Sequence, residues 1–500
     1  MQSKIANAVK SIVDTLSTRD WLILLATGMS LLYGSYFFAI ILLNLFALNI
    51  LEKKGVLDQW NATKVLGFIL MIRTNKGQKI LEKISQPRKF WRIFGEISLW
   101  ICICALFLTT LLLIFSAIAT FQTPELESIE TTDVLLIPGV SSGIPLFWPL
   151  ISLIVALVIH EYGHGIQMRA HGMRVRSFGL LITSLIPIGA FAEPEAKEIS
   201  KAPLRERMRT FSAGPAVNLI FAFFLTLILA IGISGIEPSI QGAYSAGIVV
   251  DGPADNAGLE PYDLIVGVNE TVISNSNDLQ IILNSSKPND VLLLHILPFN
   301  DGEWKEEVSI EITLGDKFEH YRTLNYSEED LAILGVVPGD SFMGISSDGS
   351  GPVIRSTDQG KQRLMGPFYP DLTSEQRIVE AIIHPIQLLS TPLSFDGEVM
   401  SDIEGKMLDW NPAEKILING IFWFFWINFI LGFANLIPVI PFDGGHIMRD
   451  SIQAIITRTS EKLGIAHPQK ASIFATKTAN IVSLLFIGIF LIPILFRLLS

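Results

Sequence analysis

Six long apolar stretches set the first limit on how this 500-residue chain can fold. A helix needs about 20 consecutive apolar residues to cross the roughly 30 Å hydrocarbon core of a bilayer. Half of the residues are hydrophobic and only 17% are charged, against about 25% charged residues in soluble domains. The sequence therefore predicts a polytopic α-helical membrane protein. The six predicted spans are Trp21–Ile50, Trp100–Phe121, Ile144–Met168, Phe211–Ile236, Ile416–Ile440 and Ala475–Leu499.

Charged residues are distributed unevenly between the predicted spans. Lys and Arg gather in 51–98, 169–210 and 441–473, whereas 122–143 and 237–415 are acidic. Because basic loops stay on the cytoplasmic side of a membrane, we expect the first three segments inside the cell and the other two outside. Six spans then leave both termini outside. The net charge of −11 argues against binding to nucleic acid, which requires basic surfaces.

The acidic segment after the fourth span has the pattern of a small folded domain. Short runs of apolar residues alternate with turn residues, and one helical pattern follows the second run. This order predicts an extracytoplasmic α+β domain inserted between two spans. Its expected elements are strands at 246–251, 263–269, 290–297 and 308–314, with a helix at 276–284.

The chain as a whole divides into six expected regions. Only the segment between the inserted domain and the fifth span lacks a clear pattern, and one helix is expected there, at 374–389. The regions are a two-span N-terminal region with a basic cytoplasmic loop (1–143), core spans (144–236), the inserted domain (237–315), a poorly defined extension (316–415), a further core span (416–455) and a C-terminal span (456–500).

A shorter apolar segment, Phe178–Ala192, follows the third span. It is too short for a spanning helix, and Pro187 and Gly189 interrupt it. Backbone that is not helical is tolerated at membrane depth only where protein covers it or water reaches it. We therefore interpret the segment as a re-entrant strand or hairpin that lines a cavity. A poorly formed span is the alternative.

The third span ends in the sequence His160-Glu161-Tyr162-Gly163-His164. Four residues turn a helix through about 400°, so the two imidazoles share one face, one turn apart. This is the spacing at which two histidines bind one zinc ion while the neighbouring glutamate acts as a general base. Ionisable groups at membrane depth are costly, which favours a functional role for them.

A catalytic zinc site takes three protein ligands and leaves its fourth position to water. The candidate for the third ligand is Asp443, the first acidic residue after the fifth predicted span. Pro438 and Pro441 break that span near its cytoplasmic end, which is also the end of the third span at which His160 lies. The common depth allows the two elements to meet. The sequence therefore predicts one zinc ion per chain, bound by His160, His164 and Asp443, with Glu161 as the catalytic base.

Together these motifs resemble those of the site-2 protease family of intramembrane zinc metalloproteases. The resemblance rests on His160–His164 and on the pattern Asn435-x-x-Pro-x-x-Pro-x-Asp443-Gly-Gly. The segments Pro187–Pro194 and Phe211–Asn218 are also similar to segments of that family. The inserted domain resembles a PDZ domain of bacterial type, at the insertion point that many members of the family use.

The resemblance implies contacts between the site and an unwound substrate. Asn435 and Asn218 would hydrogen-bond the substrate backbone, and the strand 187–191 would pair with the substrate along its edge. That strand comprises Pro187, Ile188, Gly189, Ala190 and Phe191.

The resemblance also implies the substrates and the cellular place. The substrates would be single-span transmembrane proteins in the lipid bilayer, cut first by another protease, or signal-peptide remnants. The protein itself would be an integral protein of a prokaryotic cell membrane, with its active site toward the cytoplasm and its PDZ-like domain outside. The alternative is a catalytically idle receptor or scaffold that binds peptides through the PDZ-like domain. Such a receptor has no need of the base and the three candidate ligands, all of which are present here.

Overall fold

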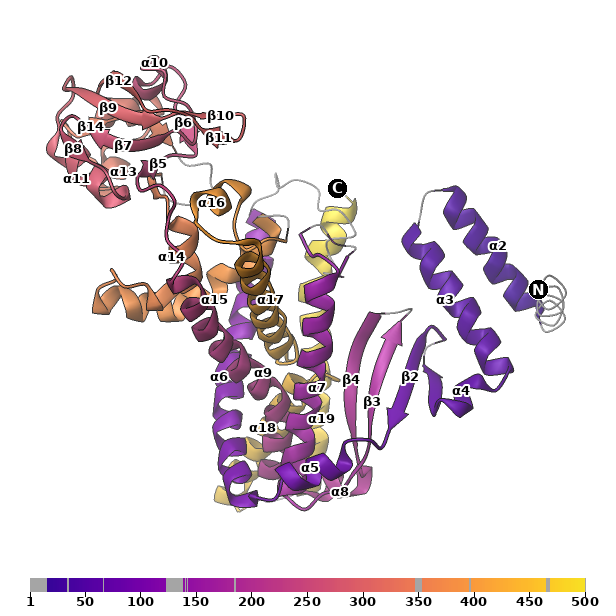
Figure 1. Ribbon diagram of the computed structural model, residues 1–500. Coiled ribbons are helices and arrows are strands. Elements are labelled where there is room, and N and C mark those ends of the chain that lie inside the picture. Colours follow the sequence, from indigo (N-terminus) through magenta and orange to yellow (C-terminus); the bar gives the residue numbers. More distant parts are fainter. Residues whose placement is uncertain are drawn as a thin grey trace, which may run out of the picture. The chain divides into compact units, whose positions relative to one another are not determined.

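The computed structural model of the protein describes residues 16–33, 36–65, 67–122, 138–139, 141, 143–183, 186–346, 353–394, 397–464 and 468–499. The chain divides into two compact units (Figure 1). The first comprises residues 1–141, 145–224 and 423–500, and the second comprises 142–144 and 225–422. Most of the predicted outer loop 122–143 lies outside the described residues.

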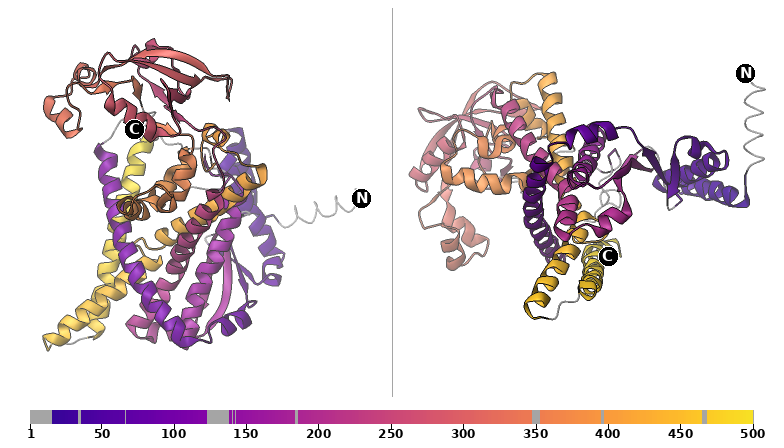
Figure 2. Two further views of the ribbon diagram at one scale, coloured as in Figure 1. Left: turned by 60° about the vertical axis from the view of Figure 1, so that its left-hand side comes forward. Right: turned by 90° about the horizontal axis from the view of Figure 1, so that it is seen from below.

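Within the described ranges, 5 helices are long and apolar enough to cross a membrane. They correspond to the second through sixth predicted spans and confirm a polytopic helical membrane protein. The last of them, α19, lies alongside α6 and the shorter helix α18 (Asp443–Lys462), as Figures 1 and 2 show. The five are α6 (Arg88–Gln122), α7 (Phe147–Ala170), α9 (Leu204–Ser234), α17 (Pro412–Ala434) and α19 (Pro468–Leu499).

The first predicted span, Trp21–Ile50, is not one continuous helix. The chain forms two helices there, α2 (Thr18–Leu32) and α3 (Tyr36–Lys53), which lie side by side. Gly34 and Ser35 separate them in the sequence, and residues of these two types favour a break in a helix. Asp20 at the start of α2 is buried and forms an ion pair with Lys53 at the end of α3. A buried carboxylate needs such a partner, so the pair fixes the hairpin.

A four-stranded antiparallel sheet joins two distant parts of the first unit. Its strand order is β1-β2-β3-β4, so the hairpin β1–β2, which precedes α6 in the sequence, pairs with the hairpin β3–β4, which follows α7. The segment Phe178–Ala192 therefore forms the expected β hairpin, and the alternative of a poorly formed span is wrong. β4 ends the strand order and lies next to α7 (Figure 1). The strands are β1 (Ala62–Val65), β2 (Ile69–Thr74), β3 (Val175–Thr183) and β4 (Ile186–Pro194).

Small residues let the helices of the first unit approach each other closely. A Cβ on Gly163 of α7 would lie 2.8 Å from the carbonyl oxygen of Ala213 on α9. A Cβ on Gly432 of α17 would lie 2.8 Å from Cδ2 of Leu219 on α9. Close helix contacts through glycine are typical of membrane proteins, where van der Waals packing drives helix association.

Short helices of this unit are α4 (Val56–Gln59), α5 (Gln78–Ile84) and α8 (Ala196–Lys201).

The second unit contains the inserted α+β domain. Its sheet has the order β12-β9-β7-β5-β16, with β8 paired to β7, and its apolar core includes Ile265, Leu279 and Leu294. The expected strands and the helix at 276–284 are present, although β6 is shorter than expected. These elements are β5 (Ala243–Tyr244), β6 (Gly247–Ile248), α10 (Pro253–Asn256), β7 (Leu264–Val268), β8 (Thr271–Val272), α11 (Ser276–Ser285), β9 (Val291–Leu297), β10 (Phe299–Asn300), β11 (Glu303–Trp304) and β12 (Val308–Thr313).

The sheet pairing of this domain extends beyond residue 315, where the sequence suggested that the domain ends. The chain returns to the sheet as β16, which pairs with β5 so that Ser356 lies opposite Ala243. β15 pairs with β6 in a separate two-stranded sheet. The helix expected at 374–389 is present as α15. The remaining elements are β13 (Gly315–Asp316), α12 (Lys317–Thr323), α13 (Glu328–Ile333), β14 (Ser341–Phe342), β15 (Ile345–Ser346), β16 (Arg355–Ser356), α14 (Gln359–Met365), η1 (Gly366–Phe368), α15 (Ser374–Ser394) and α16 (Asp402–Met407).

Candidate metal centre

The two histidines of the His-Glu-x-x-His motif lie on one face of α7, as their spacing predicts. Both side chains are buried, and their Nε2 atoms are 3.1 Å apart. α7 continues to Ala170, so the motif is placed by regular helix geometry, without a turn or a bulge. A continuous helix is a rigid support for a pair of ligands.

Asp443 comes from a distant part of the chain and closes on both histidines. It is the first residue of α18, directly after the segment with Pro438 and Pro441 that follows the end of α17 at Ala434. One carboxylate oxygen, Oδ2, lies 3.2 Å from Nε2 of His160 and 3.2 Å from Nε2 of His164. The three side chains therefore converge in the structure, as expected from the common membrane depth of the two elements that carry them.

The outer nitrogen of each histidine identifies the atoms that face the centre. Nδ1 of His160 lies 2.8 Å from the side-chain oxygen of Asn218, and Nδ1 of His164 lies 2.7 Å from the carbonyl oxygen of Thr210. Carbonyl oxygens only accept hydrogen bonds, so each Nδ1 carries the proton and donates it. When each ring carries only this proton, both Nε2 atoms present lone pairs to each other and to the Asp443 carboxylate. A metal cation at the point where the three atoms meet would satisfy all of them.

The distances within this group suit a zinc ion. Zinc forms bonds of about 2.0–2.1 Å to histidine nitrogen and carboxylate oxygen, so two ligand atoms of a tetrahedron lie about 3.3 Å apart. The three separations here are 3.1, 3.2 and 3.2 Å. Two imidazoles and one carboxylate form a donor set that catalytic zinc sites use. The residues present therefore fit the ion.

Gly214 on α9 leaves the space that the two imidazoles occupy. A Cβ at this position would lie 2.8 Å from Nε2 of His160 and would also collide with the ring of His164. Any side chain larger than hydrogen would displace at least one ring, because a real Cβ essentially never approaches another atom so closely. The glycine is therefore part of the centre, although it supplies no ligand.

Glu161 is held beside the histidines by the backbone of β4. One of its carboxylate oxygens lies within 4.8 Å of the candidate ligand atoms of His160 and His164. Its Oε2 accepts a hydrogen bond of 2.6 Å from the backbone N–H of Ala192. Glu161 is half-buried, whereas the two histidines are buried. The contact joins the candidate base to the strand that was expected to bind the substrate.

That contact also defines which edge of β4 is open. The N–H of Ala192 points toward Glu161 and hence away from β3. Successive residues of an antiparallel strand alternate in the direction of their backbone polar groups. The N–H and C=O of Ala190 therefore also face away from β3. Of the expected strand 187–191, Pro187 is buried, and Gly189, Ala190 and Phe191 are half-buried.

The two asparagines expected to contact substrate have different surroundings. Asn435 is half-buried, and its side-chain amide donates to the carbonyl of Leu431. Asn218 is fully buried: besides accepting from His160, its amide donates to the carbonyl of Ala156 and to Asn428. In this arrangement the side chain of Asn218 holds His160, and its hydrogen bonds are made within the protein.

Asn428, the buried partner of Asn218, was not among the residues predicted from the sequence. Its signal was an asparagine in the middle of the apolar stretch Ile416–Ile440. A buried polar side chain at membrane depth needs a partner, and this one lies seven residues, about two helical turns, before Asn435. Asn428 also donates to the carbonyl of Phe424 on its own helix.

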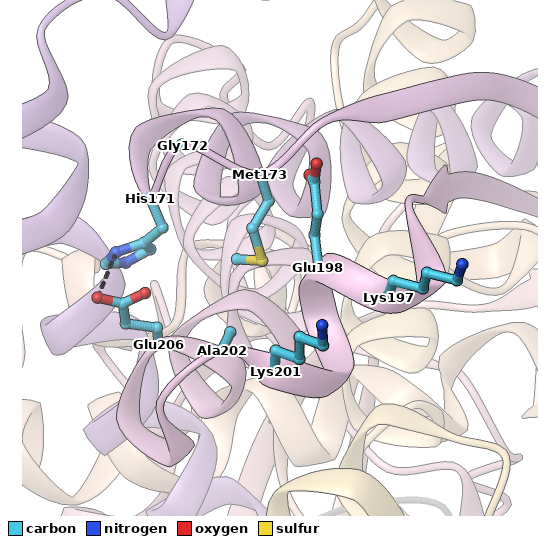
Figure 3. A pocket seen from close by; sticks show the side chains of 8 residues that line it. All are labelled: His171, Gly172, Met173, Lys197, Glu198, Lys201, Ala202 and Glu206. Carbon is cyan, nitrogen blue, oxygen red and sulfur yellow. Dashed lines mark ion pairs between the residues drawn. The ribbon is translucent and has the colours of Figure 1, made fainter.

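Two other histidines of the first unit have separate surroundings. The ring of His446 stacks on Phe211 with centroids 4.5 Å apart. His171 lies at the end of α7 beside a pocket of about 380 Å³, and its Nδ1 is 3.6 Å from a carboxylate oxygen of Glu206 (Figure 3). Burial lowers the pKa of His171. Glu206 opposes this effect, and the nearby Arg92 and Arg209 add to it. Neither histidine is a member of the candidate metal group.

Several known proteins are similar to this chain in sequence. An uncharacterized protein of Methanocaldococcus jannaschii is 25% identical over 79% of this chain and 80% of its own length. A putative zinc metalloprotease of Mesorhizobium japonicum is 23% identical over 63% of this chain and 90% of its own length. Zinc metalloprotease Rip1 of Mycolicibacterium smegmatis is 25% identical over 61% of this chain and 84% of its own length.

The membrane-spanning helices and the zinc-compatible centre define the class of membrane metalloproteases. The sequence profile of peptidase family M50 matches residues 148–474, which is more than half of the chain. The chain therefore belongs to peptidase family M50, the site-2 protease family.

Proposed function

We propose that the protein is a zinc-dependent intramembrane endopeptidase that cleaves single-span membrane proteins in or near their transmembrane segments. The observation that carries this proposal is the meeting of three candidate ligand atoms from His160, His164 and Asp443, with Glu161 beside them. One zinc ion per chain would be held by the three residues. The half-buried position of Glu161 suits a group that exchanges protons with water and substrate.

A bound zinc ion would polarise the scissile carbonyl and bring the pKa of a water molecule to about 7. Glu161 takes the proton of that water and returns it to the departing amine. His160 and His164 keep their Nε2 lone pairs directed inward because Asn218 and the carbonyl of Thr210 hold the outer nitrogens. Such partners fix the ring orientation of a metal ligand and raise its basicity.

A transmembrane helix hides its carbonyl groups in its own hydrogen bonds, so a substrate must unwind before cleavage. The open edge of β4 at Ala190 offers an N–H and a C=O that offset this loss by strand pairing. Asn435, which is half-buried, is the side chain we assign to the substrate backbone. The position of β4 next to α7 supports this arrangement.

We assign the metal centre to the cytoplasmic side of a prokaryotic cell membrane. The basic residues in the last turn of α7 and after it, which include Arg169, Arg174 and Arg176, support this orientation. The hairpin of α2 and α3 changes one expectation. Because Asp20 pairs with Lys53, the start of α2 lies beside the basic segment 51–98, so we assign the start of α2 to the cytoplasmic side.

The inserted domain is, in this proposal, a PDZ-like module that admits only substrates already trimmed by another protease. Its order of strands and helices and the helix α11 beside its sheet support this assignment. The substrates would be membrane-bound regulators of transcription or signal-peptide remnants. A catalytically idle receptor is disfavoured, because it gives no account of a base and three ligand side chains held in one place.

The decisive experiment measures cleavage and zinc content in the same samples. The purified protein and its Glu161→Gln variant are incubated with single-span test substrates, and fragments are mapped by mass spectrometry. Glu161→Gln should bind zinc at the wild-type level and lose cleavage, because only the proton acceptor is removed. Asp443→Ala should lose both. The variant Glu52→Gln, whose side chain pairs with Lys64, is the matched control and should change neither. Cleavage by Glu161→Gln at the wild-type rate would refute the proposed mechanism.

A further inference from the structure

A second buried contact joins the helix of Asp443 to the helix that passes the histidines. The carboxylate of Asp450 on α18 is fully buried. Arg207 on α9 binds it with two hydrogen bonds, of 2.9 Å from Nε and 2.7 Å from Nη2. Arg449 adds a third hydrogen bond, of 2.9 Å from its Nε. The proposed chemistry uses none of these three residues.

The spacing of this contact matches that of the metal centre. Asp450 follows Asp443 by seven residues, and Arg207 precedes Gly214 by seven residues. Seven residues are close to two turns of a helix, so each pair of positions shares a face. α9 and α18 therefore meet at two levels along the same faces. One level contains Gly214 and Asp443 at the imidazoles, and the other contains Arg207 and Asp450.

Buried apolar side chains pack between the two helices near these levels. Ile447, between Asp443 and Asp450 on α18, belongs to a buried cluster with Met208 and Ala216 of α9. Apolar contacts stabilise helix packing but define the sliding position of one helix along another only loosely. A bidentate ion pair between a guanidinium and a carboxylate has one geometry. A buried pair of this kind adds little net stability and serves better as a register device.

We propose that Arg207 and Asp450 are positioning residues that set the depth of Asp443 at the metal centre. The inference rests on the proposed function, because it assumes that Asp443 is a zinc ligand. A shift of α18 by one helical turn would move the carboxylate by about 5.4 Å, out of reach of the imidazoles. The ion pair prevents such a shift and smaller ones. It acts on metal binding through the helix and touches neither metal nor substrate.

The test measures zinc affinity of the purified full-length protein by competition with a chelator, together with thermal unfolding. Asp450→Asn keeps the shape of the side chain but removes its charge. We expect it to weaken zinc binding by about tenfold or more, the range seen when the support of a metal ligand is lost. Arg207→Lys keeps the positive charge but cannot form the two parallel hydrogen bonds of the guanidinium. It should weaken zinc binding to a smaller extent. The double exchange Arg207→Asp with Asp450→Arg should restore part of the affinity.

The control is Glu96→Gln. Glu96 lies on α6, and its carboxylate forms ion pairs with Arg205 and Arg209 of α9. The variant therefore removes an ion pair that links α9 to α6. It should lower the unfolding temperature without weakening zinc binding. Unchanged zinc affinity in both Asp450→Asn and Arg207→Lys would overturn the inference. The inference would also be overturned if Glu96→Gln lost as much zinc affinity as Asp450→Asn while both variants lost the same amount of thermal stability. If the wild-type protein binds zinc but cleaves nothing, the proposed function fails while the positioning role still stands or falls on the affinities.

The absorption spectrum of the cobalt-substituted protein gives an independent reading. A displaced Asp443 changes the ligand field, so the visible bands of Asp450→Asn should differ from those of the wild type. Glu96→Gln should retain the wild-type bands. Identical spectra in all three proteins would contradict a role of the ion pair in placing the ligand.

Discussion

The hydrogen bond from His160 to Asn218 leads to a prediction at the scale of single residues. Asn218→Ala removes the acceptor that orients the ring and should weaken zinc binding by about 10- to 100-fold. The matched variant is Asn435→Ala, since the side chain of Asn435 donates to the carbonyl of Leu431 and was assigned to the substrate. It should bind zinc normally and raise the KM for cleavage. Chelator competition and steady-state kinetics on both proteins measure the two effects, and equal zinc affinities would contradict the orienting role of Asn218.

Gly214 provides a second prediction, on steric grounds. In Gly214→Ala the new methyl group would lie where the imidazoles of His160 and His164 meet, so zinc binding should be abolished. Gly235→Ala is the control, because a Cβ on Gly235, just after the end of the same helix, meets no atom within 4 Å. The zinc content per protein molecule, measured by atomic emission after dialysis, should be near zero for Gly214→Ala and at the wild-type level for Gly235→Ala. A Gly214→Ala protein that retains zinc would show that the helices can move apart.

At the scale of elements, β4 connects the base to the substrate strand. Ala192→Pro removes the N–H that donates a hydrogen bond to Glu161. The exchange breaks no hydrogen bond to β3, because that N–H faces away from β3. The carboxylate then loses its fixed direction, so kcat should fall roughly tenfold while zinc content stays constant. Ala192→Gly keeps the N–H and should retain most of the activity. A kcat equal to that of the wild type in Ala192→Pro would show that β4 does not orient the base.

The local elements of the centre could be predicted from the sequence, whereas the long-range pairings could not. The spacing of His160 and His164 on a helix fixes their relation, and the proline-broken end of the fifth span points to Asp443. The role of Asn218 was missed because its partner His160 lies 58 residues away, and no local pattern encodes that contact. The pairing of β2 with β3 joins residues about a hundred positions apart, such as Arg73 and Gly179. The break between α2 and α3 was overlooked because apolar residues continue on both sides of Gly34.

At the scale of the whole molecule, the inserted domain can be removed at a position that the strand pairing defines. Ala243 and Ser356 are paired neighbours, so a short Gly/Ser linker can replace residues 243–356. If the domain is a size filter, the shortened protein should cleave substrates with intact extracytoplasmic regions as fast as trimmed ones. The wild type should cleave only the trimmed form. Equal rejection of untrimmed substrates by both proteins would argue against a filter.

The origin of the four-stranded sheet has a consequence for any attempt to define a minimal enzyme. The family profile begins at residue 148, after β1, β2 and α6. A fragment cut to that boundary would keep every proposed ligand and the base, yet it would leave β3 with a bare row of amide and carbonyl groups in place of β2. Such an edge recruits other chains. Truncation at the profile boundary would therefore yield a self-associating protein. The β1–β2 hairpin has to be retained for a preparation that does not aggregate.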